Sequence, residues 1–159
     1  MKKTSGIKKE IQSQKVKIAI VWSRFNDGIT HGLLKGAARG LKEAGLGQSD
    51  IHIFETPGAF EIPLLAQKIA QTSNYQGVIC LGAVIRGETA HFDYVCEGVT
   101  QGIMSAQLKT EIPMAFGILT TDTIKQAQAR SGEDDQNKGY EASKVILEMV
   151  QTLRSVISS

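Results

Sequence analysis

The sequence predicts an α/β protein in which four parallel strands form one sheet covered by helices on both faces. Four short, largely apolar segments, of which that at 77–81 is notably β-branched, alternate with longer segments that have apolar residues at helical spacing. Strands of this kind are buried on both faces, and helices connect them. Because such crossovers are right-handed, the order is typical of a flavodoxin-like, doubly wound fold. We expect one domain over residues 16–159, after a flexible, lysine-rich N-terminal arm over residues 1–15.

The first half of the chain contains two of these strands and two of the helices. The strands are expected at residues 16–22 and 51–55, with a helix over 29–44 between them. After a tight turn at 56–58, a second helix carries apolar residues at helical spacing. Its Pro63 is acceptable only because it lies in the first turn.

The second half repeats the alternation. A third strand begins at residue 77, and a fourth is expected at 114–119. The helix between them, over about 92–108, carries Gly98, Gly102 and Ala106 four residues apart. Because glycine destabilises a helix, this stripe suggests a closely packed neighbour.

The chain then ends with two more helices. A short one, capped by Thr121 or Asp122, should end near residues 130–132. After an acidic loop at 133–137, a long amphipathic helix is expected over 138–157.

The segment from Cys80 to Asp93 combines two features of a functional site. A buried strand runs through the turn Arg86-Gly87-Glu88-Thr89 into a helix whose first turn contains His91. Free N–H groups at such a helix start favour anions, and histidine titrates near neutral pH. An ordinary βα loop with a surface histidine explains the segment equally well.

Composition and motifs exclude several classes of protein. A net charge of +2 gives no sign of nucleic-acid binding, and no apolar segment is long enough to cross a membrane. The basic N-terminus lacks the apolar region of a secretory signal, so we expect a cytoplasmic protein. Cys80 and Cys96 lack CxxC partners and are expected to be reduced. The sequence contains no dinucleotide-binding, P-loop, nucleophile-elbow or zinc-protease motif, and its histidines lack metal-ligand spacing.

In a parallel sheet, the loops at the carboxyl ends of the strands meet at one edge and bind ligands there. Here these loops are 23–27, 56–61, 85–91 and the turn after 119. Phe25 lies in a polar loop. Its ring either packs on the next helix as a hydrophobic staple or serves as a platform for a flat ligand. Three other residues have ordinary structural interpretations. Glu61 is a carboxylate at a helix start, Phe116 is a core residue, and Arg130 is a partner for a helix dipole. Lys138, at a helix start, indicates an anionic neighbour.

Five motifs resemble those of the lumazine synthase family, and they cover nearly the whole chain from residue 16 onward. In order, they are Ser23-Arg24-Phe25-Asn26, Pro57-Gly58-Ala59-Phe60-Glu61-Ile62-Pro63, Gly82-Ala83-Val84-Ile85-Arg86-Gly87-Glu88-Thr89-Ala90-His91-Phe92-Asp93, Phe116-Gly117-Ile118-Leu119-Thr120 and Asn137-Lys138-Gly139. The resemblance implies the penultimate step of riboflavin biosynthesis. In that step 5-amino-6-(D-ribitylamino)uracil and 3,4-dihydroxy-2-butanone 4-phosphate condense to 6,7-dimethyl-8-ribityllumazine, phosphate and water, without metal or organic cofactor.

The resemblance also implies a role for each matched residue. His91 would transfer protons, and Phe25 would stack on the pyrimidine. The remaining residues on the pyrimidine and ribityl side would be Ala59, Phe60, Glu61, Ala83, Val84, Ile85 and Phe116. The phosphate would be held by Glu88, Thr89, Arg130 and Lys138, with the Glu88 backbone binding and its side chain pointing away.

Family members form pentamers with active sites between subunits, and some assemble sixty subunits into an icosahedral capsid. The resemblance therefore implies a homopentamer in which Phe116 and Arg130 come from the neighbouring subunit, with possible association with riboflavin synthase. Two other functions stay open: a non-catalytic binder of flavin-like rings or decayed shell protein, and an aldolase that forms a Schiff base on Lys138.

Overall fold

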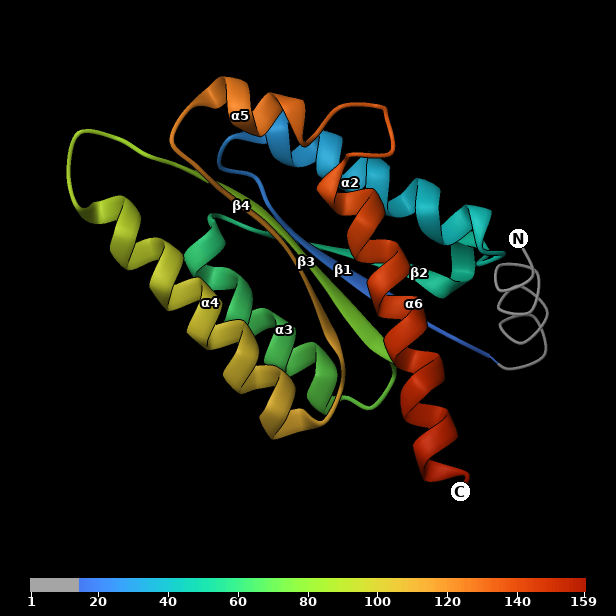
Figure 1. Cartoon of the computed structure of the whole chain (residues 1–159). Helices are drawn as coiled ribbons and strands as arrows, with labels where there is room; N and C mark the ends of the chain where they lie inside the picture. The colour runs from blue at the N-terminus through green and yellow to red at the C-terminus, as the bar shows by residue number, and fades with distance from the viewer. Residues whose placement is uncertain (1–14) are drawn as a thin grey trace.

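The structure is a computed structural model that describes residues 15–159; the predicted N-terminal arm lies, except for residue 15, outside the described residues. Four strands alternate with helices, as the sequence predicts (Figure 1). The elements are β1 (Ile18–Ser23), α2 (Asp27–Glu43), the 3₁₀ turn η1 (Gln48–Asp50), β2 (Ile51–Thr56), the 3₁₀ turn η2 (Ala59–Glu61), α3 (Ile62–Gln71), β3 (Gly77–Ile85), α4 (His91–Thr110), β4 (Met114–Thr121), α5 (Ile124–Ala129) and α6 (Lys138–Ile157). No helix in this range is long and apolar enough to cross a membrane.

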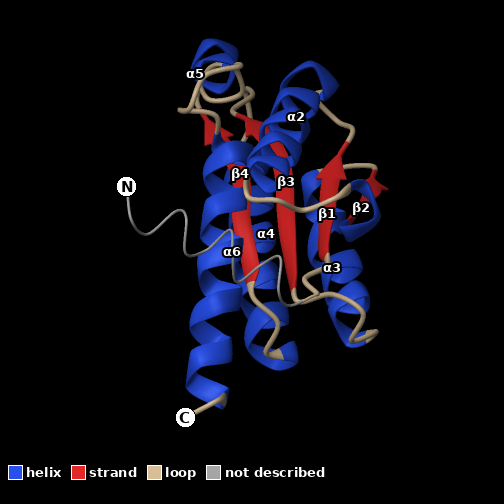
Figure 2. Ribbon diagram, turned by 90° about the vertical axis from the view of Figure 1, so that its right-hand side faces the viewer, coloured by secondary structure: helices blue, strands red, loops and turns tan. Residues whose placement is uncertain are grey.

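The four strands form one parallel sheet in the order β2-β1-β3-β4 (Figure 2). β1 pairs with β2 from Ile18 opposite Ile51 to Ser23 opposite Thr56. β3 is the longest strand and pairs with β4 as far as Ile85 opposite Thr121. The predicted flavodoxin-like, doubly wound fold is thus confirmed, and all strand ends that carry candidate residues point to the same edge.

Helices cover both faces of the sheet, and each face has its own core. Along β1, Ile18 and Ile20 face the α2 and α6 layer, whereas Ala19 and Val21 face the α3 and α4 layer. Figure 1 shows the two helix pairs on opposite sides of the strands. Because the two central strands, β1 and β3, are covered on both faces, their residues are apolar in succession rather than alternately.

The layer formed by α2 and α6 is packed through small residues. A Cβ atom at Gly139 would overlap the carbonyl oxygen of Leu33, and one at Gly40 would overlap the Ser143 hydroxyl. The backbones of the two helices therefore approach closely, and hydrogen bonds such as that from Tyr140 Oη to Glu43 Oε2, 2.8 Å long, join their rims.

The glycine stripe on α4 also has close neighbours, and they belong to the same chain. A Cβ atom at Gly98 would lie 2.6 Å from the Phe60 ring, and one at Gly102 would lie 2.7 Å from Pro63. The predicted close approach to this stripe is therefore made by η2 and the start of α3.

The predicted cap of the short helix is wrong. The cap of α5 is Thr123, whose side chain accepts a hydrogen bond from the Gln126 N–H, while the Gln126 side chain binds back. Neither Thr121 nor Asp122 can cap it, because Thr121 is still paired in β4. The other predicted elements occur, with ends shifted by a few residues, and Cys80 and Cys96 are free thiols.

Candidate active site

A cavity of about 410 Å³ opens at the carboxyl edge of the sheet. It is bounded by the loop after β1, by η2, by the end of β3 and by the first turns of α4. Nine of the predicted site residues line it: Phe25, Ala59, Phe60, Glu61, Ala83, Val84, Ile85, Thr89 and His91. The sheet-edge rule therefore located most of the candidate residues correctly.

Two aromatic rings form the exposed rim of the cavity. Phe25 is 70% and Phe60 is 60% exposed, so neither ring has joined the core. The loop that carries Phe25 is held by backbone hydrogen bonds from Arg24 N to Thr56 O and from Phe25 N to Pro57 O. An apolar ring fixed at the mouth of a cavity is a suitable surface for a flat heterocycle.

Asn26 lines the cavity as well, and the sequence analysis gave it no role by itself. It adopts a left-handed conformation with φ of 61°, and its Nδ2 donates to the carbonyl oxygen of Ala83 over 3.0 Å. This bond ties the loop after β1 to the end of β3. An asparagine in a turn before a helix signals such a conformation, because it tolerates positive φ better than most residues.

Glu61 enters the cavity from the turn that precedes α3. The turn is closed by Glu61 N donating to Gly58 O and by Thr56 Oγ1 donating to the same carbonyl. A Cβ atom at Gly58 would lie 2.9 Å from Glu61 Oε2, so glycine leaves room for this carboxylate. Glu61 can therefore accept hydrogen bonds from ligand hydroxyls at the cavity wall.

The loop before α4 combines unpaired donors with a titratable group. The backbone N–H groups of Gly87, Glu88 and Thr89 have no hydrogen-bond partner among the described residues. The N–H of His91 is 3.4 Å from Thr89 Oγ1, and the ring of His91 lines the cavity. Free donors beside the start of a 20-residue helix favour an oxyanion.

Arg86 anchors this loop to its surroundings. Its Nε lies 2.7 Å from Asp122, its Nη1 lies 3.3 Å from Asp93, and its guanidinium stacks 4.3 Å from the centre of the Phe92 ring. The hydrogen bond with Asp122 raises the pKa of Arg86 above its ordinary value. With its charge balanced by two carboxylates, Arg86 links the end of β3 to α4 and to the loop before α5.

Four predicted site residues do not line the cavity of their own chain. Glu88 is exposed on the loop, and Phe116 lies on the edge strand β4 with 44% of its surface exposed. The interpretation of Phe116 as core is therefore wrong, since much of the residue is exposed in its own chain. Arg130 donates through Nη1 to the carbonyl oxygen of Gln126 over 2.9 Å, which confirms that it pairs with a helix end. Lys138 lies 2.7 Å from Glu141, so an anionic neighbour is present.

The backbones of Arg130 and Lys138 are nevertheless joined. Lys138 N donates to the carbonyl oxygen of Arg130 over 2.9 Å, closing the loop that connects α5 to α6. Although they are eight positions apart in sequence, the two residues are therefore neighbours through this backbone hydrogen bond. The sequence gave no signal for this closure.

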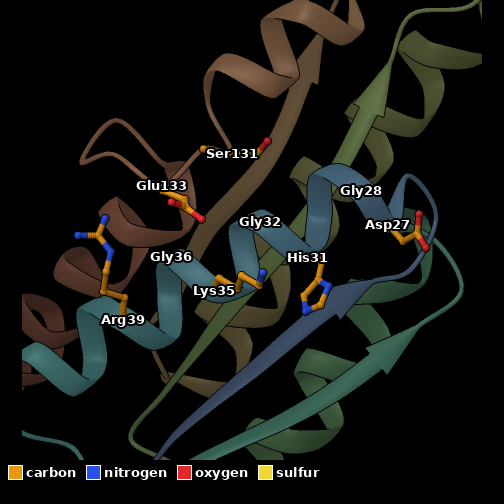
Figure 3. A pocket seen from close by; sticks show the side chains of 10 residues that line it. Asp27, Gly28, His31, Gly32, Lys35, Gly36, Arg39, Ser131 and Glu133 are labelled. Atoms are coloured by element: carbon orange, nitrogen blue, oxygen red, sulfur yellow. The ribbon is translucent and has the colours of Figure 1, made fainter.

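A second cavity, of about 630 Å³, lies between α2 and residues 131–133 (Figure 3). Figure 3 shows His31, Lys35 and Arg39 along α2, with Asp27 and Glu133 also at the wall. None of the predicted site residues lines it. Its wall carries charges of both signs, so it is a polar groove without a preference for one class of ligand.

One buried hydroxyl near the first cavity has no partner. Ser23 is 1% exposed, and its Oγ is the single buried side-chain N or O atom without a hydrogen bond among the described residues. A Cβ atom at Gly82 would lie 3.1 Å from it and 3.2 Å from Ala59. It therefore lies beside Gly82, on the face of the sheet where Ala59 lines the cavity.

The comparison with known protein families agrees with this site. Residues 15–154 match the family model described as 6,7-dimethyl-8-ribityllumazine synthase. The match includes every strand, every helix that borders the cavity and all of the predicted site residues. The chain belongs to the lumazine synthase family. Membership places it at the lumazine-forming step of riboflavin biosynthesis, and the predicted resemblance is confirmed.

Proposed function

We propose that this protein condenses 5-amino-6-(D-ribitylamino)uracil with 3,4-dihydroxy-2-butanone 4-phosphate. The products are 6,7-dimethyl-8-ribityllumazine, phosphate and water, and the reaction uses no metal or organic cofactor. The observation that carries the proposal is the cavity in which Phe25, Glu61 and His91 meet in a chain of the lumazine synthase family. An exposed ring, a hydroxyl acceptor and a titratable imidazole are what a ribityl-substituted heterocycle and its proton transfers require.

The pyrimidine would enter the apolar part of the cavity. Phe25 stacks on its ring, while the backbone of Ala83, Val84 and Ile85 at the end of β3 faces its polar edge. Ala59 and Phe60 border the ribityl chain, and Glu61 accepts hydrogen bonds from its hydroxyls. All seven residues line the cavity.

His91 would move the protons. Attack of the amine on the ketone, loss of phosphate and ring closure each need a proton donor or acceptor near neutral pH, and one histidine serves in both directions. Since both substrates are intrinsically reactive, much of the acceleration comes from holding them in register.

The phosphate would be bound at the loop before α4 by donors from two subunits. The free N–H groups near Glu88 and the hydroxyl of Thr89 come from one chain, with the Glu88 carboxylate turned away. Arg130, with its planar fork of donors, and Lys138 come from a neighbouring chain, which also contributes Phe116. The open position of Phe116 and the distance of both cations from the cavity of their own chain support this arrangement.

We also propose a homopentamer, with a shell of sixty subunits and association with riboflavin synthase as further assembly states, in the cytoplasm. Large apolar side chains are exposed along α3 and α4, among them Leu64, Tyr94 and Leu108. Patches of this kind mark protein interfaces. Light scattering should give a mass of at least five chains; a monomer would contradict a site completed by a neighbour.

The direct test is to mix the two substrates with the protein and follow lumazine absorbance. His91→Ala should lower kcat by about 100-fold, the low end of the range for general acid–base catalysis. His31→Ala is the matched control, because His31 lies on α2 outside this cavity and contacts Trp22. An unchanged kcat for His91→Ala would remove this role, and a wild-type protein that binds the pyrimidine without forming lumazine would indicate a non-catalytic binder.

Arg130→Ala tests the second half of the site. Losing a charge-assisted contact with phosphate should raise KM for the phosphorylated ketone by about tenfold and leave KM for the pyrimidine nearly unchanged. Lys125→Ala, on the exposed face of the same short helix, is the control. Equal changes in both KM values would argue against contact with the phosphate.

A further inference from the structure

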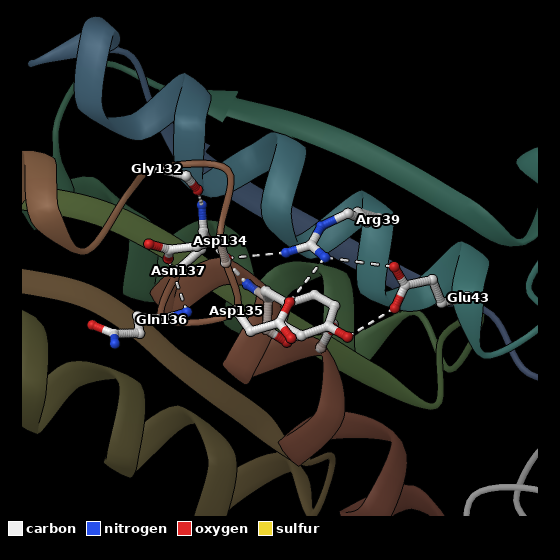
Figure 4. A network of polar contacts seen from close by, with 9 residues as sticks. Arg39, Glu43, Gly132, Asp134, Asp135, Gln136 and Asn137 are labelled. Atoms are coloured by element: carbon white, nitrogen blue, oxygen red, sulfur yellow. Dashed lines mark hydrogen bonds and ion pairs between the residues drawn. The ribbon is translucent and has the colours of Figure 1, made fainter.

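Asn137 is the residue that fixes the loop between α5 and α6. Its side chain is 1% exposed, although the loop itself, residues 130–137, lies at the surface. Figure 4 shows it between the carbonyl group of Gly132 and the acidic residues of the loop. An amide so deeply buried must satisfy its hydrogen bonds within the protein.

The Asn137 amide uses its donors and its acceptor at the same time. Oδ1 accepts from Gly139 N over 2.8 Å and from Tyr140 N over 3.1 Å, which caps α6. Nδ2 donates to Gly132 O over 2.6 Å and to Gly32 O over 3.0 Å. Aspartate, serine or threonine could also cap the helix, but an ionised aspartate or a hydroxyl could not supply both donors. The bond to Gly132 closes the loop on itself, and the bond to Gly32 joins the loop to α2.

The surface of α2 is shaped to receive this clamp. A Cβ atom at Gly36 would overlap the Asn137 amide, and one at Gly32 would overlap the Ser131 carbonyl oxygen. One turn further, Arg39 donates to Asp134 O and to Asp135 Oδ1, each over 3.1 Å, and its guanidinium stacks 3.9 Å from the centre of the Tyr140 ring. Figure 4 shows these contacts around Arg39.

Arg130 and Lys138 stand at the two ends of the clamped segment. Arg130 precedes the residues that Asn137 binds, Lys138 follows Asn137 directly, and their backbones are joined by the hydrogen bond from Lys138 N to Arg130 O. Between them lie Glu133, Asp134 and Asp135. If the loop were released, both cations would lose their common base, and three carboxylates would gain freedom to approach a bound anion.

We propose that Asn137 is a positioning residue for the phosphate ester: through its two donor bonds it holds Arg130 and Lys138 in one binding arrangement. The inference rests on the proposed function for the identity of the ligand. A cation that is held before binding loses less conformational freedom when the phosphate arrives, so the clamp increases affinity without touching the ligand.

The variant that isolates this role is Asn137→Asp. It keeps the shape and the two accepted bonds of the helix cap, but when ionised it replaces the donor to Gly32 and Gly132 by a carboxylate oxygen that repels both carbonyl oxygens. Tyr140→Phe is the matched control, because it removes a hydrogen bond between α2 and α6, to Glu43, and keeps both the ring on which Arg39 stacks and the backbone N–H that Asn137 caps. Binding of inorganic phosphate by calorimetry and both KM values should be measured on the intact assembly.

We expect Asn137→Asp to weaken phosphate binding and to raise KM for the phosphorylated ketone by about tenfold, with KM for the pyrimidine changed less than about twofold. The loss should shrink at acid pH, where a protonated carboxyl regains one donor. Tyr140→Phe should leave both KM values unchanged. Equal changes in the two KM values, or the same pattern in Tyr140→Phe, would overturn the proposal.

If Asn137→Asp does not fold, Arg39→Met tests the same loop from a more exposed position. It removes the contacts with Asp134 and Asp135 and should weaken phosphate binding in the same direction by about threefold, since one of two anchors remains. A wild-type protein that forms no lumazine would contradict the proposed function alone. The phosphate titration then decides this inference, and no binding to wild type, or equal binding to wild type and variants, would overturn it.

Discussion

The two faces of the sheet are built in different ways. On one face, α2 and α6 meet through Gly40 and Gly139, and hydrogen bonds close their rims. On the other face, α3 and α4 also approach through glycines, but the groups that fill the space are the exposed ring of Phe60 and the ring of Pro63. We call the first face finished because its two helices are closed on each other within one chain, although α6 also exposes Val145 and Met149. We call the second face open because the Phe60 ring that fills its helix contact stays exposed at the cavity.

This difference shows which part of the chain is held rigidly. The finished face carries the loop with Arg130 and Lys138, which the Asn137 clamp fixes on α2. The open face borders the cavity, and in the proposed pentamer its exposed residues would meet a neighbouring chain. A site completed by a neighbouring chain needs both: a rigid segment that is presented and an open surface that receives it. The predictions below test each face, beginning with the finished one.

Gly139→Ala should have the largest effect. Its Cβ would overlap the backbone of Leu33 on α2, and backbone cannot rotate away as a side chain can. We expect a loss of about 3 kcal/mol in the free energy of unfolding, as for severe overpacking. Urea titration at one fixed protein concentration, with circular dichroism as the signal, measures it.

Gly28→Ala is the matched control for this prediction. It lies near the start of α2, where a Cβ atom would meet no other atom within 4 Å. Alanine there should change stability by less than about 0.5 kcal/mol, as expected for a surface position. If Gly139→Ala were equally mild, α2 and α6 could move apart, and the first face would be no more rigid than the second.

The fold was predictable because its signals are local. The apolar segments 16–22 and 114–119 are short and separated by helices, and the first is rich in β-branched residues, so the parallel sheet followed from handedness and crossover rules. The ends of elements were less predictable. β4 extends to Thr121 because Ile85 remains its partner, and pairing with a distant strand has no local signal.

The candidate site was likewise predictable only in part. Phe25 and His91 were singled out because each is unusual in its own loop, whereas Glu61 was predicted only through the family resemblance; all three line one cavity at the sheet edge. The clamp by Asn137 was not found, because its partners lie 105 and 5 positions away and are backbone carbonyls, which any residue carries. Phe116 was assigned to the core because it lies in an apolar strand, but β4 is the edge strand of the sheet and Phe116 is exposed there.

Cys80 tests how tightly α3 and α4 close over the sheet. It faces that layer from β3, and burial raises the pKa of its thiol from 9.0 to about 12. Between these values the unfolded chain has lost the proton that the folded chain keeps, so stability falls as pH rises from about 9. The loss should approach about 1.4 kcal/mol per pH unit before levelling off near pH 12.

The measurement compares wild type and Cys80→Ala in urea at several pH values between 8 and 10.5, under reducing conditions. The variant is expected to be less stable at pH 8, where it leaves a small void, but its stability should fall less steeply above pH 9. Parallel curves for the two proteins would mean that water reaches Cys80 through the open face.

Gly98→Ala should give the smallest change in stability. Alanine favours a helix interior over glycine by about 1 kcal/mol, and the atom in its way is the far edge of the Phe60 ring, which is 60% exposed. In a single chain the ring can turn aside, so we expect the free energy of unfolding to rise by up to about 1 kcal/mol. Because Phe60 also lines the cavity, KM for the pyrimidine should rise while KM for the phosphorylated ketone stays constant. A loss of stability would instead show that the Phe60 ring is fixed. Because this ring is exposed in its own chain, a neighbouring chain would then have to hold it.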